Sequence, residues 1–268
     1  MRKFAIVLNL LLLTLFLSSC VSTTAPGAVG INRKQFFIVS SAEMEQGAKM
    51  YYAKTLTDAK NKGELNVNAK EYRRIQEIAN RLIAQSHIFK KEALNWDWEI
   101  NVIDEDILNA WCMPGGKIAI YTGIIRRLNL SDAEIAAIIG HEMAHALREH
   151  GRERASSQQL KEVGLYAISM ATGDDLITGL SNMAAEYTIM LPFSRSHETE
   201  ADIIGTELMA RAGYNPNAAI NVWKKMQKIG SSSTIEFLST HPSHESRIKT
   251  LEEISQKVMP IYIQTTQK

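Results

Sequence analysis

The chain has 268 residues, of which 45% are hydrophobic and 22% are charged, and its formal net charge is +1. This is the composition of a globular protein, long enough for one large domain or two small ones. A net charge this close to zero gives no support to a nucleic-acid-binding role, so we expect no nucleic acid among its partners.

The N-terminus has the pattern of a secretory signal. Two basic residues precede the apolar run 4–17, which is too short to span a bilayer comfortably. The run ends in Leu17-Ser18-Ser19-Cys20, which resembles a bacterial lipobox. The resemblance implies export, a signal peptide over residues 1–19 and a lipid on Cys20. The alternative is an ordinary cleaved signal followed by an incidental cysteine.

The residues after Cys20 indicate where a lipidated chain would be located in the cell. Val21 is not an aspartate, which by the usual sorting rule for bacterial lipoproteins favours the outer membrane, facing the periplasm. Residues 20–35 are rich in small and turn-forming residues and are predicted to form a lipidated, flexible tether. We expect one folded domain over 36–268, in which Cys112 is a structural, buried thiol.

Two helices and a strand are predicted next. Ser40 begins a capping box that opens a helix to about residue 60, and residues 68–86 repeat apolar side chains at helical spacing. From Trp96 to Val102, apolar and polar residues alternate strictly, which predicts a half-buried strand.

A hairpin is predicted after that strand. A Pro-Gly-Gly turn separates residues 109–113 from a second extended run over 118–122. An exposed strand edge can pair with the backbone of an extended peptide, and we expect Asn109, Ala110 and Trp111 to form such a substrate-binding edge. The alternative is a plain hairpin without a binding role.

The segment that follows carries the chemistry. Residues 131–134 form a capping box that opens a buried helix, and this helix contains His141-Glu142-x-x-His145. Residues four apart lie about 40° apart on one helix face, which suits two imidazoles on one metal ion. Zinc binds neutral imidazole and acidifies a bound water, from which an adjacent carboxylate can take a proton. The pattern predicts a hydrolytic zinc site.

His150 is a candidate for a third ligand that we reject. It follows His145 by five residues without the intervening glycine of the zinc-peptidase class that takes its third ligand nearby. In a continuous helix, five residues turn the side chain about 140° away from the metal face. We therefore expect His150 at the surface near the helix end.

The stretch from Lys161 to Phe193 is apolar but is interrupted by Asp174, Asp175 and Glu186. It predicts two helices joined near residues 172–175, and no membrane span.

Acidic side chains after this stretch offer the missing ligand. Glu198 and Asp202 are four residues apart on a predicted helix, so one can ligate zinc while the other accepts a hydrogen bond from a ligand imidazole. His197 and Glu200 lie in the same segment, and spacing alone leaves the choice among them open.

The C-terminal part contains one more candidate. A helix is predicted from Asn215 to Ile229, followed by a loop with Ser231 to Ser233. His241 is then expected at the start of the final helix, where its imidazole can stabilise an oxyanion or cap the zinc in a resting state. The alternative is a histidine that only caps the helix.

Together these residues resemble the HtpX-like and CAAX prenyl protease type 1 family of zinc metallopeptidases, family forty-eight of the metallopeptidases. The resemblance covers roughly residues 40–251 and includes the hairpin, the zinc motif, Glu198-x-x-Ala201-Asp202 and Thr240-His241-Pro242. It implies an α+β, mostly helical, zincin-like (gluzincin) domain with a small sheet or hairpin edging the cleft.

The resemblance also assigns roles. It implies that His141, His145 and Glu198 hold one Zn²⁺, that Glu142 is the general base and that Asp202 supports a ligand. We expect a zinc endopeptidase that hydrolyses unfolded, damaged or misassembled envelope proteins, attached to the membrane through its N-terminal lipid and associated with envelope assembly machinery. The alternative is a zinc-stabilised chaperone or assembly factor with little turnover.

Overall fold

The computed structural model describes residues 20–172, 192–229, 236–242 and 246–267. The strands are β1 (Cys20–Val21), β2 (Gln35–Phe36), β3 (Glu99–Ile103), β4 (Ala110–Met113) and β5 (Lys117–Tyr121). The helices are α2 (Ser41–Asn61), α3 (Ala69–Ile83), α4 (Thr122–Arg127), α5 (Asp132–Leu147), α6 (His150–Thr172), α8 (Arg195–Arg211), α9 (Asn217–Ile229), α10 (Glu236–Thr240) and α11 (Ser246–Thr266). Two 3-10 turns, η1 (Ser86–Ile88) and η2 (Lys91–Asn95), precede β3. This confirms the predicted α+β, mostly helical class.

A three-stranded sheet in the order β3-β5-β4 lies beside the helices. β3 runs parallel to β5, and β4 is antiparallel to β5. Both faces of the central strand are covered, because Ile118 and Ile120 point into the main helical core whereas Ala119 packs with Tyr52 of α2. β4 has β5 on one side only, so its other edge is open to partners outside the sheet.

The predicted hairpin is confirmed as β4 and β5. Its turn depends on glycine, because Gly116 has a φ of 83° and a Cβ there would lie 2.6 Å from the ring of Trp98. The first strand of the sheet starts later than expected, at Glu99 rather than Trp96. The physical reason is pairing, because the backbone N–H of Glu99 bonds to Gly116 and β5 offers no partner before Lys117.

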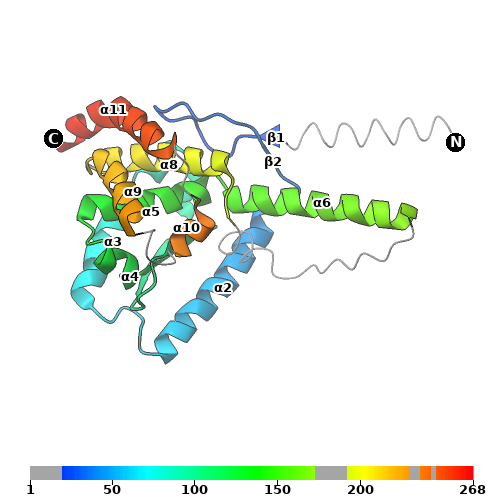
Figure 1. Cartoon of the computed structure of the whole chain (residues 1–268), viewed down its shortest axis with the longest axis horizontal. Helices are drawn as coiled ribbons and strands as arrows, with labels where there is room; N and C mark the ends of the chain where they lie inside the picture. Colours follow the sequence, from blue (N-terminus) through cyan, green and yellow to red (C-terminus); the bar gives the residue numbers. More distant parts are fainter. Residues whose placement is uncertain (1–19, 173–191, 230–235, 243–245, 268) are drawn as a thin grey trace.

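Helix α5 is the centre of the helical part. Nearly all of its side chains are buried, and it contacts β4, α3, α8 and α9. α11 packs on α8 and α9, at the end of the molecule opposite the projecting helix α6 (Figure 1). A helix covered on so many sides holds its own side chains in fixed positions, which a metal site requires.

The N-terminal segment packs on the domain and corrects the expectation of a flexible tether over 20–35. β1 and β2 pair with Cys20 opposite Phe36, and the segment between them runs along α8 and α11 (Figure 1). The backbone N–H groups of Ala28 and Val29 donate to Glu207 of α8, and Lys257 of α11 donates to the Val29 carbonyl. Small residues are needed here because the backbone passes close to Phe89 and Glu207. We call residues 20–39 the strap.

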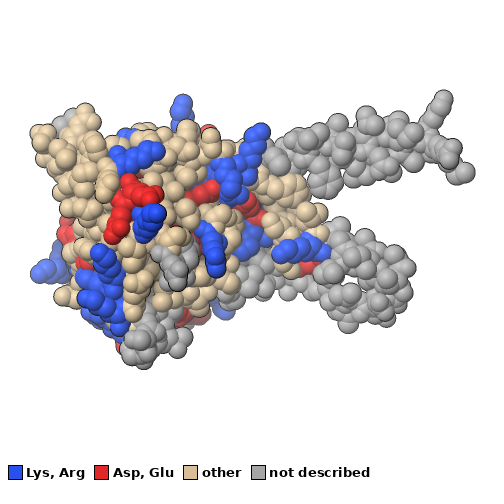
Figure 2. Space-filling model, turned by 45° about the horizontal axis from the view of Figure 1, so that its top comes forward, with Lys and Arg blue, Asp and Glu red and all other residues tan. Residues whose placement is uncertain are grey.

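Several expectations lie outside the described residues. They are the signal peptide over 1–19, the second helix expected before Phe193 and the loop at Ser231 to Ser233. In the parts of the chain that the structure describes, no helix has both the length and the apolar character needed to cross a bilayer. Basic and acidic side chains lie among one another on the face shown in Figure 2.

Candidate metal centre

The start of α5 is fixed by its own sequence. The Ser131 side chain accepts from the backbone N–H of Glu134, and Glu134 returns the bond to the backbone of Ser131, so the predicted capping box forms. Glu134 also pairs with Lys225 of α9 at 2.7 Å. Cap and ion pair together fix where the helix begins, and hence the rotation of the zinc motif about its axis.

Two glycines let α5 and α8 meet at the site. A Cβ on Gly205 would lie 2.7 Å from the backbone nitrogen of His141, and one on Gly140 would lie 2.9 Å from the Gly205 carbonyl. No side chain separates the helices at this point. The close approach brings His141 and His145 of α5 against Glu198 and Asp202 of α8.

Four buried side chains converge there. Ligand-type atoms of His141, His145, Glu198 and His241 lie within 4.8 Å of one another. The Nε2 atoms of His141 and His145 are 3.1 Å apart, and His145 Nε2 is 3.3 Å from Glu198 Oε1. His241 Nδ1 lies 3.0 Å from the same carboxylate oxygen and 3.3 Å from His141 Nε2.

These distances test whether the residues fit zinc. Ligand atoms placed about 2.0–2.1 Å from a tetrahedral ion are roughly 3.3–3.4 Å from one another. The observed spacings of 3.0 to 3.3 Å are close to that value. Imidazole nitrogen and carboxylate oxygen are also the ligand types that zinc takes in proteins. The cluster therefore fits a single zinc ion.

Glu142 lies beside the cluster. It is 3% exposed, and its Oε1 atom has no hydrogen-bond partner among the described residues, while His241 Nε2 is 3.5 Å away. Burial raises the pKa of the Glu142 carboxyl. A carboxylate with a raised pKa and a free oxygen is suited to accept and return a proton.

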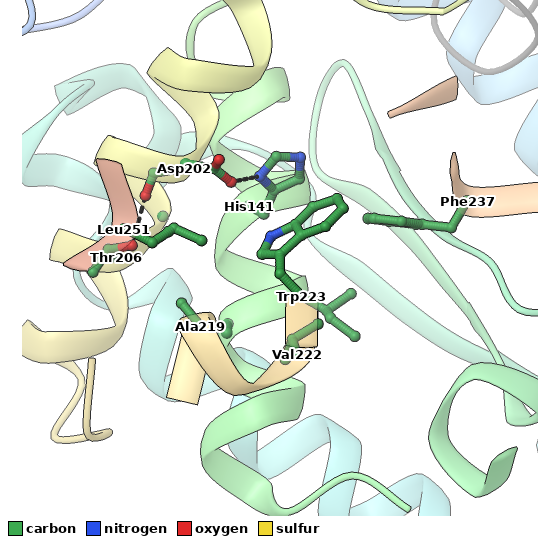
Figure 3. A pocket seen from close by; sticks show the side chains of 11 residues that line it. His141, Asp202, Thr206, Ala219, Val222, Trp223, Phe237 and Leu251 are labelled. Carbon is green, nitrogen blue, oxygen red and sulfur yellow. Dashed lines mark hydrogen bonds and ion pairs between the residues drawn. The ribbon is translucent and has the colours of Figure 1, made fainter. Parts of the chain in front are cut away.

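Two acidic side chains and an arginine lie against the ring of His141. Its Nδ1 lies 2.9 Å from Asp202 Oδ1, and Figure 3 shows this contact above the ring of Trp223. Burial lowers the pKa of His141, but hydrogen bonds to Asp202 and Glu198 outweigh it and raise the pKa to about 9. Arg247 of α11 donates to Glu198 at 2.5 Å and to Asp202 at 2.8 Å, and its guanidinium stacks 3.5 Å from the Trp223 ring.

Arg247 was not predicted from the sequence. It is 1% exposed, and fully buried arginines are rare unless they are paired. It lies five residues after Pro242, and the spacing of charges alone did not distinguish it from the solvated basic residues of the final helix.

His150 is buried, so its expected surface position is wrong. It is 0% exposed, and its Nδ1 lies 3.0 Å from His145 Nδ1. The reason is that α5 does not continue into α6, because Glu149 has a φ of 54°, in the left-handed region. The chain turns there, and His150 returns over His145 instead of rotating away from it.

The other two candidates of α8 lie outside the four-residue cluster. His197 Nε2 lies 3.2 Å from Glu153 of α6, and its ring stacks on His150 with centroids 4.4 Å apart. Glu200 Oε2 lies 3.1 Å from His150 Nε2 and accepts from Arg148. Helical rotation accounts for this, since Glu200 is two positions from Glu198 and points to another side of α8.

His241 does not begin the final helix. It directly follows α10, and its backbone N–H bonds to the Phe237 carbonyl at 2.8 Å. Phe237 in turn donates its backbone N–H to Leu108, just before β4, and its ring stacks on His241 with centroids 4.4 Å apart. α10 therefore fixes His241 at the cluster from the sheet side.

The predicted substrate edge borders the same site. Asn109, Ala110 and Trp111 line a small cavity together with Glu142 and His145. All three are buried, and Asn109 donates to Glu236 of α10 at 3.3 Å.

Cys112 lines this cavity too and is 2% exposed. Burial raises the pKa of its thiol well above the usual value, so it has little thiolate character at neutral pH. This agrees with a structural role.

Known proteins similar to this chain are metallopeptidases. It is 38% identical over 167 residues to the mitochondrial metalloendopeptidase OMA1 of Arabidopsis thaliana, covering 62% of this chain and 33% of that protein. It is 34% identical over 181 residues to the protein of that name from Schizosaccharomyces pombe, covering 67% and 51%. The beta-barrel assembly-enhancing protease of Escherichia coli is 24% identical over 203 residues, covering 72% and 40%.

These comparisons contradict the expected placement at the bacterial outer membrane. The relatives with 38% and 34% identity are named as mitochondrial proteins, whereas the bacterial protease has 24% identity. The chain spans between a third and about half of the length of these relatives.

A family model, "Peptidase family M48", matches residues 69–255. The match runs from the start of α3 into α11 and so includes all four members of the cluster, Glu142 and Arg247. It confirms the resemblance at the level of the family, and the chain belongs to peptidase family M48.

Proposed function

We propose that the chain is a zinc-dependent endopeptidase that hydrolyses peptide bonds in unfolded or misassembled protein segments. The observation that carries this proposal is Glu142, a buried carboxylate beside four converging ligand atoms, one oxygen of which accepts no hydrogen bond from the described residues. A binding module has no use for such a group, because a buried carboxylate oxygen without a hydrogen bond costs free energy. A hydrolase needs it as the base.

His141, His145 and Glu198 would hold the zinc, and Asp202 would orient His141. When bound, zinc polarises the scissile carbonyl and lowers the pKa of a water toward about 7. Glu142 takes a proton from the attacking water and then passes it to the leaving amine. Burial, which raises the pKa of Glu142, makes its carboxylate a better proton acceptor in the first transfer.

We propose that His241 caps the site in a resting state. Its Nδ1 lies 3.0 Å from Glu198 Oε1, where it would be a fourth ligand in the position that a catalytic zinc site keeps open. Its Nε2 lies 3.5 Å from Glu142 Oε1, so His241 would have to move out before Glu142 could act on a water at the site. An oxyanion-stabilising role for the same side chain requires this movement first.

We propose the open edge of β4 as the place where substrate backbone binds. The edge borders Glu142 and His145, and strand addition gives affinity without strict sequence reading. Such a site suits unfolded chains, whose backbone groups are free to pair. Phe193 and α10 cover the edge and must move for a peptide to enter.

A second candidate is a zinc-stabilised assembly factor with little turnover. This candidate is supported by the name of the Escherichia coli relative, a beta-barrel assembly-enhancing protease, which links that protein to assembly.

One variant of the full chain, Glu142→Gln, distinguishes the two candidate functions. We would measure bound zinc and the cleavage of a reduced, carboxymethylated protein, with Glu252→Gln on the exposed side of α11 as control. The peptidase proposal expects unchanged zinc and a cleavage rate lowered about 10²–10⁴-fold. Cleavage by Glu142→Gln at the parental rate would refute the proposed base, and no zinc-dependent cleavage by the parent chain would favour the assembly factor.

A further inference from the structure

A second buried polar cluster lies behind His145, on the side of that ring opposite Glu198. It contains His150 and Glu200, which are 0% and 6% exposed, together with the buried Arg148, and the half-buried Arg33 closes its outer side. None of the proposed catalytic steps uses these four residues. Burying this many polar groups is costly unless their hydrogen bonds have a purpose or compensate one another.

The contacts within the cluster form a chain that ends at the ligand. Glu200 Oε2 lies 3.1 Å from His150 Nε2, and His150 Nδ1 lies 3.0 Å from His145 Nδ1. A carboxylate only accepts hydrogen bonds, so Nε2 of His150 must carry a proton. A neutral imidazole then has an acceptor at Nδ1, and His145 must donate from its own Nδ1.

This proton arrangement leaves His145 Nε2 with a free lone pair. That atom is the one facing His141 and Glu198, at 3.1 and 3.3 Å. The other proposed ligand, His141, is supported in the same way but without a bridging imidazole, because its Nδ1 contacts Asp202 directly at 2.9 Å. Among the described residues, no carboxylate contacts His145 Nδ1, and His150 bridges the distance to Glu200.

Two guanidinium groups hold Glu200 in place. Arg148 Nε donates to Oε2 at 3.0 Å, and Arg33 Nε donates to Oε1 at 2.6 Å. Arg33 belongs to the strap, and Arg148 donates to Ser22, Thr24 and the carbonyl of Arg33, all in the strap as well. The strap therefore completes the surroundings of Glu200.

We propose that His150 and Glu200 are positioning residues that fix the tautomer and ring orientation of His145, and so set the affinity for zinc. Carboxylate partners of ligating histidines commonly act in this way, and their loss costs about 10–100-fold in metal affinity. Here the carboxylate acts through a second imidazole, and the strap holds it. This inference rests on the proposed role of His145 as a ligand.

The test compares His150→Phe with His150→Gln in the full chain. Phenylalanine keeps a buried ring but has no nitrogen, whereas glutamine can accept from His145 through its oxygen and donate to Glu200 through its nitrogen. We expect His150→Phe to weaken zinc binding about 10–100-fold in competition with a chelator, and His150→Gln to recover most of the loss. Equal zinc affinities of His150→Phe and the parent, or of the two variants, would overturn the inference.

His197→Phe is the matched control. His197 is buried and stacks on His150, but its contact is with Glu153 and not with a ligand of the cluster. A ring replacement there should leave zinc affinity unchanged. If His197→Phe weakens binding as much as His150→Phe, the effect is general loss of packing and the inference fails.

A measurement on the unaltered chain covers the case in which His150→Phe does not fold. Proton-nitrogen correlation spectra of the zinc-loaded protein report which ring nitrogens are protonated. We expect protons on His145 Nδ1 and His150 Nε2, and a proton on His150 Nδ1 instead would overturn the inference. The proposed function fails separately, when the parent chain shows no zinc-dependent cleavage, and the ligand role of His145 fails when His145→Ala binds zinc with parental affinity.

Discussion

The ring of Phe193 stacks on the imidazole of His145, with centroids 3.9 Å apart and the two planes inclined by 29°. The backbone N–H of Phe193 donates to the Thr240 carbonyl at 2.8 Å, which joins this cover to the residue before His241. The cavity between β4 and the cluster has a volume of only about 10 Å³, so no peptide fits in this conformation. Access to the site therefore depends on movement of Phe193 and the end of α10.

Phe193→Leu should open the site. Leucine keeps an apolar side chain but loses the flat contact with His145, worth about 0.5–1.5 kcal/mol for aromatic pairs. We expect removal of zinc by a chelator and cleavage of an unfolded protein both to become several-fold faster. Phe89→Leu, the same change in the core away from the cluster, should lower stability without affecting zinc release. Unchanged release from Phe193→Leu would show that this ring does not limit access.

Arg247→Lys should weaken the metal site while keeping the charge. Arg247 donates to both Glu198 and Asp202, and a lysine ammonium cannot reproduce that planar arrangement. We expect zinc affinity to fall about tenfold, by chelator competition, together with a lower unfolding temperature. Arg81→Lys is the control, because Arg81 also stacks over a ring, that of Tyr214, but outside the site. Parental zinc affinity in Arg247→Lys would exclude a supporting role for this guanidinium.

Gly205→Ala should separate α5 from α8. The added Cβ would lie 2.7 Å from the backbone nitrogen of His141, so the helices must move apart. Overpacking of this kind costs about 1–3 kcal/mol. We expect the free energy of unfolding, measured with denaturant, to fall by that amount and zinc binding to weaken. Thr199→Ala, at a half-buried position of the same helix, should change neither quantity appreciably. A fully stable Gly205→Ala protein with normal zinc affinity would contradict the close-contact explanation.

Glu153 should make stability sensitive to acid. Burial alone would raise its pKa, but hydrogen bonds from Arg33, His197 and Gln35 outweigh burial and hold the pKa well below the usual value. The pKa of Glu153 is thus lower in the folded than in the unfolded state. Its contribution to the free energy of unfolding is therefore fully present above the unfolded pKa of about 4.3 and is lost as the pH falls through the folded pKa.

Arg33→Met removes the main partner of Glu153 and should reduce stability at pH 7 more than at pH 3. The free energy of unfolding, measured with urea across this range, should therefore decline less steeply in the variant. Arg33 is 35% exposed, so solvent screening moderates the effect. Arg74→Met, which breaks an exposed pair with Asp132, is the control and should leave the slope unchanged. A parental slope in Arg33→Met would contradict the assignment.

Local patterns predicted the helices and the metal motif because their causes are local. The capping boxes at Ser40 and Ser131 form as expected, and His141 and His145 share a face because helix geometry requires it. The choice of Glu198 needed the family resemblance, since spacing alone also allowed Glu200.

Non-local causes explain what the sequence did not predict. The turn at Glu149 interrupts a stretch with continuous helical periodicity, and the position of His150 depends on that single φ angle. The strap looks like a linker because its contacts with Glu207 and Lys257 use its backbone atoms, which composition does not report. Arg247 and Phe193 reach the site only through tertiary packing, so neither has a local signal.

X-ray absorption at the zinc edge of the full, zinc-loaded chain tests the central claim most directly. The account predicts one zinc with three imidazole nitrogens and one carboxylate oxygen at about 2.0–2.2 Å, and one imidazole fewer in His241→Ala. A sulfur neighbour at about 2.3 Å, which Cys112 in the adjoining cavity could provide, or fewer than three imidazoles in the parent, would contradict it.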